Sequence, residues 1–157
     1  MEKWMNFPDF HGPGWPSPSQ LEHYFLTSSG RRQAFEIGND CWGLSGIGVH
    51  GTENLPPGKG RINLGLTILG NPDHGVLLHY RKGGGVYRDS FYSKGDLTLL
   101  REWVTTASDD LFPVGLYIPF ETAWKAVKEF IETDGQLPKS IEWVAGNDLP
   151  ADAFPDP

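Results

Sequence analysis

The middle of the chain alternates between hydrophobic residues and polar or small ones, a pattern typical of β-strands with one buried face. In residues 61–69, four aliphatic side chains share one face of the predicted strand: Ile62, Leu64, Leu66 and Ile68. The other face carries small or polar residues: Asn63, Gly65 and Thr67. We predict further strands at residues 33–37, 41–49, 76–81, 86–92, 97–106 and 140–144. Short turns separate successive strands, so the pattern predicts an antiparallel meander.

A helical period replaces this alternation after Pro119. The apolar residues recur at helical spacing: Phe120, Ala123, Trp124, Val127, Phe130 and Ile131. We expect Pro119 as the first helical residue, where its missing N–H costs nothing, and Gly135 as the C-terminal stop. Glu121 and Lys125 have the i,i+4 spacing of a favourable ion pair on the polar face of this helix.

A shorter amphipathic helix is predicted at residues 18–27, with Gly30 marking its end. The prolines and aromatic residues of residues 1–18 predict an irregular arm that docks on the body, because proline disrupts helices and strand ladders. We expect a single α+β domain at residues 19–146, an antiparallel β-sheet meander with one long C-terminal helix packed on a face and a short N-terminal helix. Residues 147–157 are expected to form an acidic, proline-containing tail.

The chain has a net charge of −7, from 20 acidic and 13 basic side chains. This balance argues against direct binding to nucleic acid or to an anionic membrane, because both partners require clustered Lys and Arg. Residues 132–157 carry six acidic side chains and one basic side chain, Lys139, and thus five of the seven net negative charges. A solvated acidic tail and an interaction surface for a basic partner protein both explain this distribution.

The single cysteine, Cys41, excludes an intramolecular disulfide and suits a reducing compartment. The residues after Met1 do not have the apolar stretch of a signal peptide. No run of apolar residues approaches the 18 that a membrane-spanning helix requires, so the sequence predicts no membrane span. These observations favour a cytoplasmic protein.

Residues that could carry chemistry do not form a recognisable motif. The histidines lack the spacing of a zinc site: His11, His23, His50, His74 and His79. The glycines of residues 51–60 and 83–85 fit turns better than phosphate-binding loops. A nucleophilic pair of Cys41 with a histidine stays open, although no basic residue adjoins Cys41 to activate its thiol. We expect no cofactor, no metal and no enzymatic activity.

A stretch near the C-terminus carries a family signature. Ile118-Pro119 precedes a helix that contains Ala123 and reaches Phe130, and the helix is followed by Thr133-Asp134-Gly135-Gln136-Leu137-Pro138 and Ile141-Glu142-Trp143. This order resembles the C-terminal signature of the Imm1 family of bacterial immunity proteins, with Asp134 inserted before Gly135 and Leu137 before Pro138. The specific match covers residues 117–143, with a looser match over residues 19–146. Each signature residue also has a fold role, so function follows only through the family.

The resemblance implies a cognate toxin protein as the partner. Proteins similar to Imm1 are encoded beside polymorphic toxins, often nucleic-acid-targeting ones and especially deaminase-type toxins, whose substrate groove is basic. An acidic protein would be steered to such a groove and would cover it. We expect contact through Glu142 and through acids on loops: Asp109, Asp110, Asp148 and Asp152.

Two other classes of protein stay open. A small carbohydrate- or peptide-binding module would use three tryptophans outside the predicted core: Trp4, Trp15 and Trp42. The remaining tryptophans lie on apolar faces of predicted elements and are expected in the core: Trp103, Trp124 and Trp143. A small hydrolase would be built around Cys41 or His79.

Overall fold

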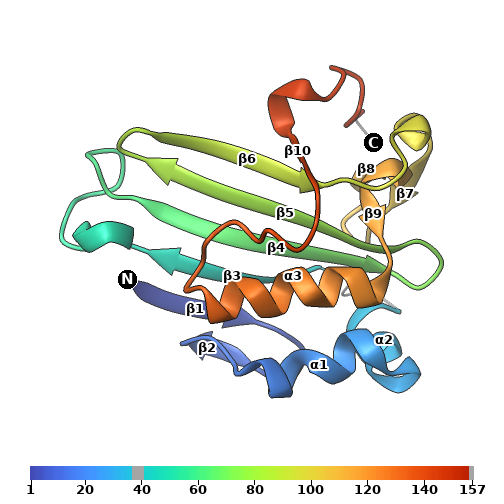
Figure 1. The fold of residues 1–157 in the computed structure, drawn as a ribbon, viewed down its shortest axis with the longest axis horizontal. Helices are drawn as coiled ribbons and strands as arrows, with labels where there is room; N and C mark the ends of the chain where they lie inside the picture. Colours follow the sequence, from blue (N-terminus) through green and yellow to red (C-terminus); the bar gives the residue numbers. More distant parts are fainter. Residues whose placement is uncertain (37–40, 156–157) are drawn as a thin grey trace.

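The computed structural model describes residues 1–36 and 41–155, and its centre is an antiparallel β-sheet (Figure 1). The strands run in the order β10-β6-β5-β4-β3-β1-β2, and β9 pairs with the start of β5. Their bounds are β1 Glu2–Asn6, β2 His11–Pro13, β3 Cys41–Ile47, β4 Asn63–Asn71, β5 Gly75–Gly84, β6 Tyr87–Ser93, β9 Tyr117–Ile118 and β10 Trp143–Ala145. A small separate sheet pairs β7 Trp103–Thr105 with β8 Leu111–Pro113. The helices are α1 Pro18–Leu26, α2 Ser28–Phe35 and α3 Phe120–Glu132, with 3-10 helices η1 Val49–Gly51, η2 Leu97–Leu99, η3 Val114–Leu116 and η4 Gly146–Asp148.

The predicted antiparallel α+β fold is confirmed, and β3, β4, β5 and β6 follow one another as a meander. Leu66 and Ile68 of β4 are buried, whereas Thr67 between them is only half-buried. In the strand register, Leu66 lies opposite Leu44 on one side and Tyr80 on the other. Because these residues share one face, the alternation in the sequence corresponds to one apolar and one more open face of the sheet.

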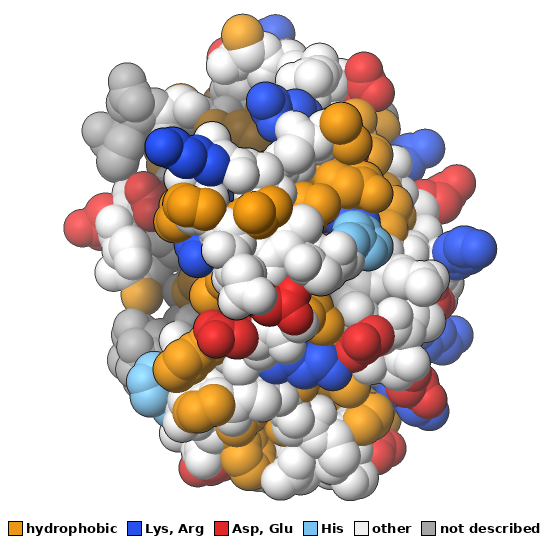
Figure 2. Space-filling model, turned by 90° about the vertical axis from the view of Figure 1, so that its left-hand side faces the viewer, with side chains coloured by type: hydrophobic (Ala, Val, Ile, Leu, Met, Phe, Trp, Pro, Cys, Tyr) orange, Lys and Arg blue, Asp and Glu red, His pale blue; other side chains and the backbone are white. Residues whose placement is uncertain are grey.

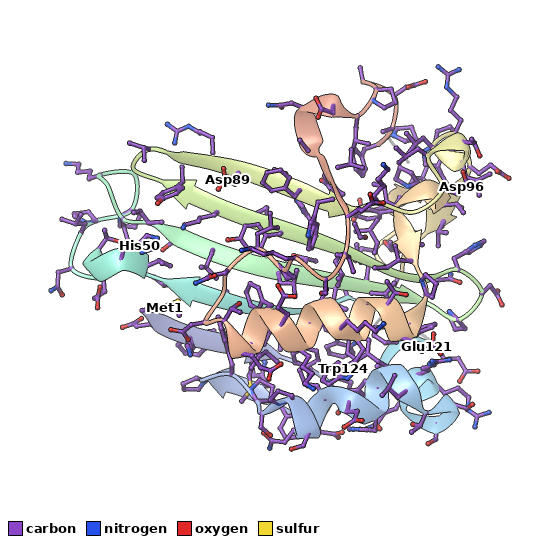
Figure 3. The ribbon with its side chains drawn as sticks, in the orientation of Figure 1. Met1, His50, Asp89, Asp96, Glu121 and Trp124 are labelled. Carbon is purple, nitrogen blue, oxygen red and sulfur yellow. The ribbon has the colours of Figure 1, made fainter. Side chains whose placement is uncertain are left out.

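α3 covers the apolar face of the sheet, as the C-terminal pattern predicts (Figure 1). Its buried side chains follow the helical period: Phe120, Ala123, Trp124, Ala126, Val127 and Phe130. Phe130 is fully buried, and its ring centroid lies 5.0 Å from that of Trp15 and 6.2 Å from that of Tyr80. α3 therefore joins the strands to the N-terminal segment through one aromatic cluster. Trp124, labelled in Figure 3, lies between α3 and the N-terminal helices, and its ring centroid is 5.3 Å from that of Phe25 of α1.

The two ends of α3 differ in detail from the expectation. Pro119 is the N-cap residue, one position before the helix, and not its first residue. Glu121 forms an ion pair with Arg31 of α2 at 2.8 Å instead of the expected pair with Lys125. At the other end Gly135 has φ 92° and donates its N–H to a carbonyl in the last turn at 2.8 Å, which confirms it as the stop.

The N-terminal helix is predicted correctly for α1, but the prediction for the residues after α1 is wrong. Gly30 does not end α1; it lies inside α2, whose N-cap Thr27 accepts a hydrogen bond from the Gly30 N–H at 3.0 Å. A Cβ atom at Gly30 would lie 1.9 Å from the His23 carbonyl oxygen, so glycine allows α2 to start against the end of α1. The strand predicted at residues 33–37 is wrong, because α2 extends through most of it; its last residue, Ile37, lies outside the described residues.

Residues 1–18 do not form the irregular arm that their prolines predict. β1 pairs with β3, and β2 pairs with β1, so this segment extends the main sheet. Pro8 lies in the turn between the two strands, and Pro13 ends the outer strand, where a missing N–H breaks no inner ladder. The expected docking of aromatic side chains is confirmed, because Phe7 is buried and Trp15 donates its indole N–H to a β3 carbonyl at 2.8 Å.

The strand predicted at residues 97–106 is largely wrong. Its first part is η2, because the Asp96 side chain accepts a hydrogen bond from the Thr98 N–H at 3.0 Å and caps a helical turn. The extended part is β7, which pairs with β8 and not with the main sheet. Trp103 of β7, expected in the core, is 37% exposed and donates its indole N–H to the Ala153 carbonyl at 2.9 Å.

The face of the sheet opposite α3 is covered only at one end. A second apolar cluster lies there: Leu69, Leu77, Val104, Leu116 and Tyr117. Among the described residues, the helices pack with α3 on the other face, so the rest of this face stays open. None of these helices has the length and hydropathy needed to cross a membrane.

Replacing Phe130 with alanine should lower the free energy of unfolding by about 3–5 kcal/mol, because a fully buried aromatic ring is lost and a cavity remains. Urea denaturation followed by tryptophan fluorescence measures this change. Lys128→Ala removes an exposed side chain from the same helix and should change the free energy by less than about 0.5 kcal/mol. Equal effects of the two substitutions would contradict the central position of Phe130.

Candidate functional site

The acidic residues expected at an interface lie on exposed turns and loops around the smaller sheet and the C-terminal segment. Asp109 and Asp110 occupy the turn between β7 and β8, and Glu142 immediately precedes β10. Asp148 belongs to η4, and Asp152 lies in the segment after it. All five side chains are exposed. In Figure 1 the segment after β10, drawn in red, rises from the same end of the sheet that carries β7 and β8.

Aromatic contacts fix the C-terminal segment beside the smaller sheet. The ring centroid of Phe154 lies 5.2 Å from that of Tyr92 and 5.9 Å from that of Phe112. These contacts hold Asp152 near Arg101, with a nitrogen–oxygen distance of 3.5 Å. Within the described residues, no group of three or more His, Cys, Asp or Glu side chains could hold a metal ion. The acids therefore form a dispersed negative surface and not a cation site.

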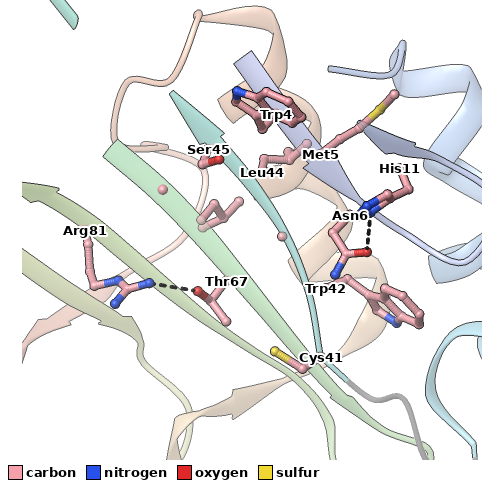
Figure 4. Close-up of a pocket in the computed structure, with 13 residues that line it drawn as sticks. Trp4, Met5, Asn6, His11, Cys41, Trp42, Leu44, Ser45, Thr67 and Arg81 are labelled. Atoms are coloured by element: carbon pink, nitrogen blue, oxygen red, sulfur yellow. Dashed lines mark hydrogen bonds between the residues drawn. The ribbon is translucent and has the colours of Figure 1, made fainter. Parts of the chain in front are cut away.

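Two adjoining depressions lie on the open face of the sheet. The first, of about 390 Å³, lies between Trp4 of β1 and Arg81 of β5 (Figure 4). The second, of about 560 Å³, continues toward the β5–β6 hairpin, and Ser45, Gly65 and Arg81 line both. We call the combined depression the open-face groove and define it by six of its lining residues: Trp4, Gly65, Gly83, Arg61, Arg81 and Arg88.

Glycine makes the open-face groove hollow. Gly65 of β4 and Gly83 of β5 lie in neighbouring strands, and neither has the positive φ that requires glycine. A Cβ atom at Gly65 would have its nearest neighbour at 3.6 Å, which is ordinary contact, and one at Gly83 would have no neighbour within 4 Å. Glycine weakens a strand, and the internal packing of the protein does not explain its presence at either position.

Arginine gives the open-face groove a positive charge. Arg81 donates to the Thr67 hydroxyl at 3.5 Å, the bond drawn in Figure 4, and Arg88 donates to a backbone carbonyl at 2.9 Å. The Nε atom of Arg61 is buried without a hydrogen-bond partner. None of the described residues that line the two depressions is Asp or Glu. Figure 2 views the end of the molecule near the β5–β6 hairpin, where acidic, basic and hydrophobic side chains are interspersed. The described lining of the groove thus differs from that end of the molecule in its lack of acids.

His79 lies next to the groove as a packed, neutral side chain. Its ring stacks on Tyr92 at a centroid distance of 4.0 Å, and its Nε2 atom lies 2.9 Å from the Ser90 hydroxyl. Burial and, to a smaller extent, the charge of Arg81 lower the pKa of His79 from 6.5 to about 4. A strand of the sheet, β4, separates His79 from Cys41, so these two residues do not form the pair that a hydrolase would use.

The three tryptophans considered for a carbohydrate- or peptide-binding module do not form one platform, although Trp4 and Trp42 both line the first depression. Trp4 is 44% exposed on the open face, whereas Trp15 packs against Phe130 beneath the other face. Trp42 is half-buried and donates its indole N–H to the Ala34 carbonyl at 2.6 Å. An aromatic platform requires several exposed rings side by side, and these three side chains do not provide it.

Sequence reasoning missed the arginines of the groove, although part of the signal was present. Arg81 comes directly after the buried Tyr80, so its side chain must point to the opposite face. Arg88 reaches the same region because the hairpin register places it opposite Gly83. That register depends on the turn geometry and cannot be read from the hydrophobic pattern alone.

Comparison with known proteins identifies one family. A family model described as immunity protein Imm1 matches residues 16–145. The matched range contains α1, the meander, α3 and β10, and it leaves out β1, β2 and the segment that carries Asp148 and Asp152. No curated protein and no solved structure matches the chain significantly.

Acidification should destabilise the protein through His79. Because folding lowers the pKa of this side chain, the stability it contributes is present above about pH 6.5 and is lost as the pH falls toward 4. We expect a loss of about 1–2 kcal/mol in the free energy of unfolding, a value discounted because the ring is partly exposed to water. Urea denaturation at several pH values measures it.

His79→Gln should remove this part of the pH dependence, whereas His74→Gln, at an exposed turn position, should leave it in place. An unchanged pH profile in the His79 variant would show that other groups cause the acid destabilisation.

Proposed function

The chain belongs to the Imm1 family of immunity proteins, and from this premise we propose that it binds a cognate bacterial toxin and neutralises it by contact rather than by catalysis. We infer that the toxin is a nucleic-acid-targeting deaminase of a polymorphic toxin system and that the complex forms in the cytoplasm. The observation that carries the proposal is the family match, which extends over most of the chain.

Charge complementarity supports a deaminase as the target. Such an enzyme draws a polyanionic strand into a basic groove above its catalytic zinc. The immunity protein has a net charge of −7 and could compete with nucleic acid for that groove. Attraction between opposite charges also speeds the encounter of the two proteins. We therefore propose that inhibition occurs by occlusion of the toxin's active site.

The local backbone supports contact through the acidic loops. Asp109 donates its N–H to the Thr106 carbonyl at 3.0 Å, and the Asp110 carbonyl accepts from the Thr106 N–H at 2.8 Å. This bonded turn presents both carboxylates at the end of the β7–β8 hairpin. We propose the same role for the exposed carboxylates near β10 and in the C-terminal segment: Glu142, Asp148 and Asp152. Carboxylates on a fixed backbone lose less conformational entropy on binding.

Binding and inhibition should be measured with the toxin domain encoded beside this gene. We expect a dissociation constant in the nanomolar range and loss of deaminase activity on single-stranded DNA or RNA at a stoichiometric ratio. Binding with inhibition of a different toxin activity would keep the immunity function and reject the deaminase. No binding to this toxin, or to others of its class, would reject the immunity function.

Reversing the charge at Asp148 and Asp152 to lysine should slow association with the toxin about tenfold at low salt and weaken its dependence on salt. Stopped-flow or surface-based kinetics at several salt concentrations measures both quantities. The matched control is Glu22→Lys with Glu36→Lys, which makes the same change in net charge at two exposed positions, one in α1 and one at the C-cap of α2. Equal slowing in the two double variants would show that net charge, and not the C-terminal acids, controls the encounter.

A further inference from the structure

We propose that the toxin docks on the open-face groove, through a toxin segment that carries a carboxylate and an apolar side chain. This inference rests on the immunity function proposed above. It adds to the acidic loops a second contact surface of opposite charge, made by the central sheet.

The charges of the groove point to a partner that supplies carboxylates. Two arginines outside the groove have acidic partners: Arg31 pairs with Glu121, and Arg101 pairs with Asp152. Among the described residues, no ion pair joins an acid to the groove arginines: Arg61, Arg81 and Arg88. In a chain of net charge −7, a groove that has three such arginines, and no acid among its described lining residues, is complementary to an acidic segment. Guanidinium groups bind carboxylates through two parallel hydrogen bonds.

The strand register defines how such a segment would lie. Trp4 lies opposite Ser45, Ser45 opposite Gly65, and Gly65 opposite Arg81, so the four residues form one row across β1, β3, β4 and β5. Neighbouring strands are about 4.8 Å apart, which places Trp4 and Arg81 roughly 14 Å apart at the backbone. An extended segment could therefore place an apolar side chain on Trp4 and a carboxylate about four residues away on Arg81.

The floor of this row accommodates a second backbone. Gly65 has no side chain, and the space above it is not needed by the protein's own atoms. Glycine in a strand commonly marks a place where another backbone approaches closely. Trp4 at the end of the row is an exposed aromatic side chain of the type that supplies much of the energy of an interface.

The ends of the sheet do not favour binding by strand addition. The edge strands β2 and β10 each have three residues, and β2 ends at Pro13. Short edges with proline offer few backbone groups to an incoming strand. The face of the sheet is therefore a better docking surface than its edges.

Two other occupants fit the groove less well. A nucleic acid strand would approach against the net charge of −7, and the groove arginines are too few to offset it along a strand. A second copy of the chain in a two-fold contact would place the same arginines against each other, which is repulsive. A toxin segment with carboxylates avoids both problems: the toxin as a whole need not be negatively charged, and its carboxylates attract the groove arginines.

Arg81→Glu tests the proposal in the binding assay with the neighbouring toxin domain. We expect the dissociation constant to rise about 100-fold, mainly through faster dissociation, because a close charge pair becomes a repulsion. Lys125→Glu, on the exposed face of α3, makes the same change in net charge and should alter the constant less than about threefold. Equal effects in the two variants would overturn the inference.

Gly65→Leu tests the floor of the groove independently of charge. A Cβ atom fits at this position, so the melting temperature should be nearly unchanged, while the added side chain fills the groove and should weaken toxin binding at least tenfold. If wild type binds the toxin and both groove variants bind equally well, the groove inference is wrong and the immunity function stands. If the wild-type protein does not bind the toxin, both the groove inference and the proposed immunity function are wrong. If the groove variants lost binding to DNA or to a second copy of the chain but kept their affinity for the toxin, the groove inference would also be wrong.

Discussion

Burial of one face of the central strands beneath α3 is the interaction on which the rest of the structure depends. Phe130 lies at its centre, between Trp15 of the N-terminal segment and Tyr80 of β5. The Tyr80 hydroxyl donates to the Gly135 carbonyl at 3.2 Å, which ties the end of the helix to the sheet. α1 packs on the outer side of α3, where Phe25 contacts Trp124. Because the main core lies on the α3 side, the part of the opposite face that the second apolar cluster leaves uncovered is not required for the core and is open.

The parts of the fold that depend on local pattern could be predicted from the sequence. Strong alternation defines β4, and a helical period defines α3, since in both cases one side of the element is buried. The secondary-structure predictions were wrong where a single side chain or one long-range strand pairing determines the local structure. Gly30 looks like a helix end but permits a close approach of two helices, and the prolines before residue 18 hide strands that need β3 as a partner.

The candidate site also has one part that local sequence predicts and one part that depends on long-range strand pairing. The exposed acids could be recognised from composition and loop position, and the structure places all five at the surface. The open-face groove is assembled from β1, β3, β4, β5 and β6, and its lining depends on the register of four strand pairs. No local pattern contains that register. The physical roles proposed for the two surfaces also differ: dispersed carboxylates would act over a distance through their field, whereas a glycine-floored groove with arginines would act at contact.

The alternation along β4 and β5 assigns the residues of the core and the residues of the proposed recognition surface to alternate positions in the sequence. Each side chain that faces the open groove is next to one that faces α3, yet the two groups do not touch the same neighbours. Substitutions at positions such as Thr67 or Arg81 can therefore accumulate with little change in the core. Under selection by changing toxins, substitutions could alter this surface one residue at a time while the fold stays the same. Divergence of specificity would then proceed faster than divergence of fold.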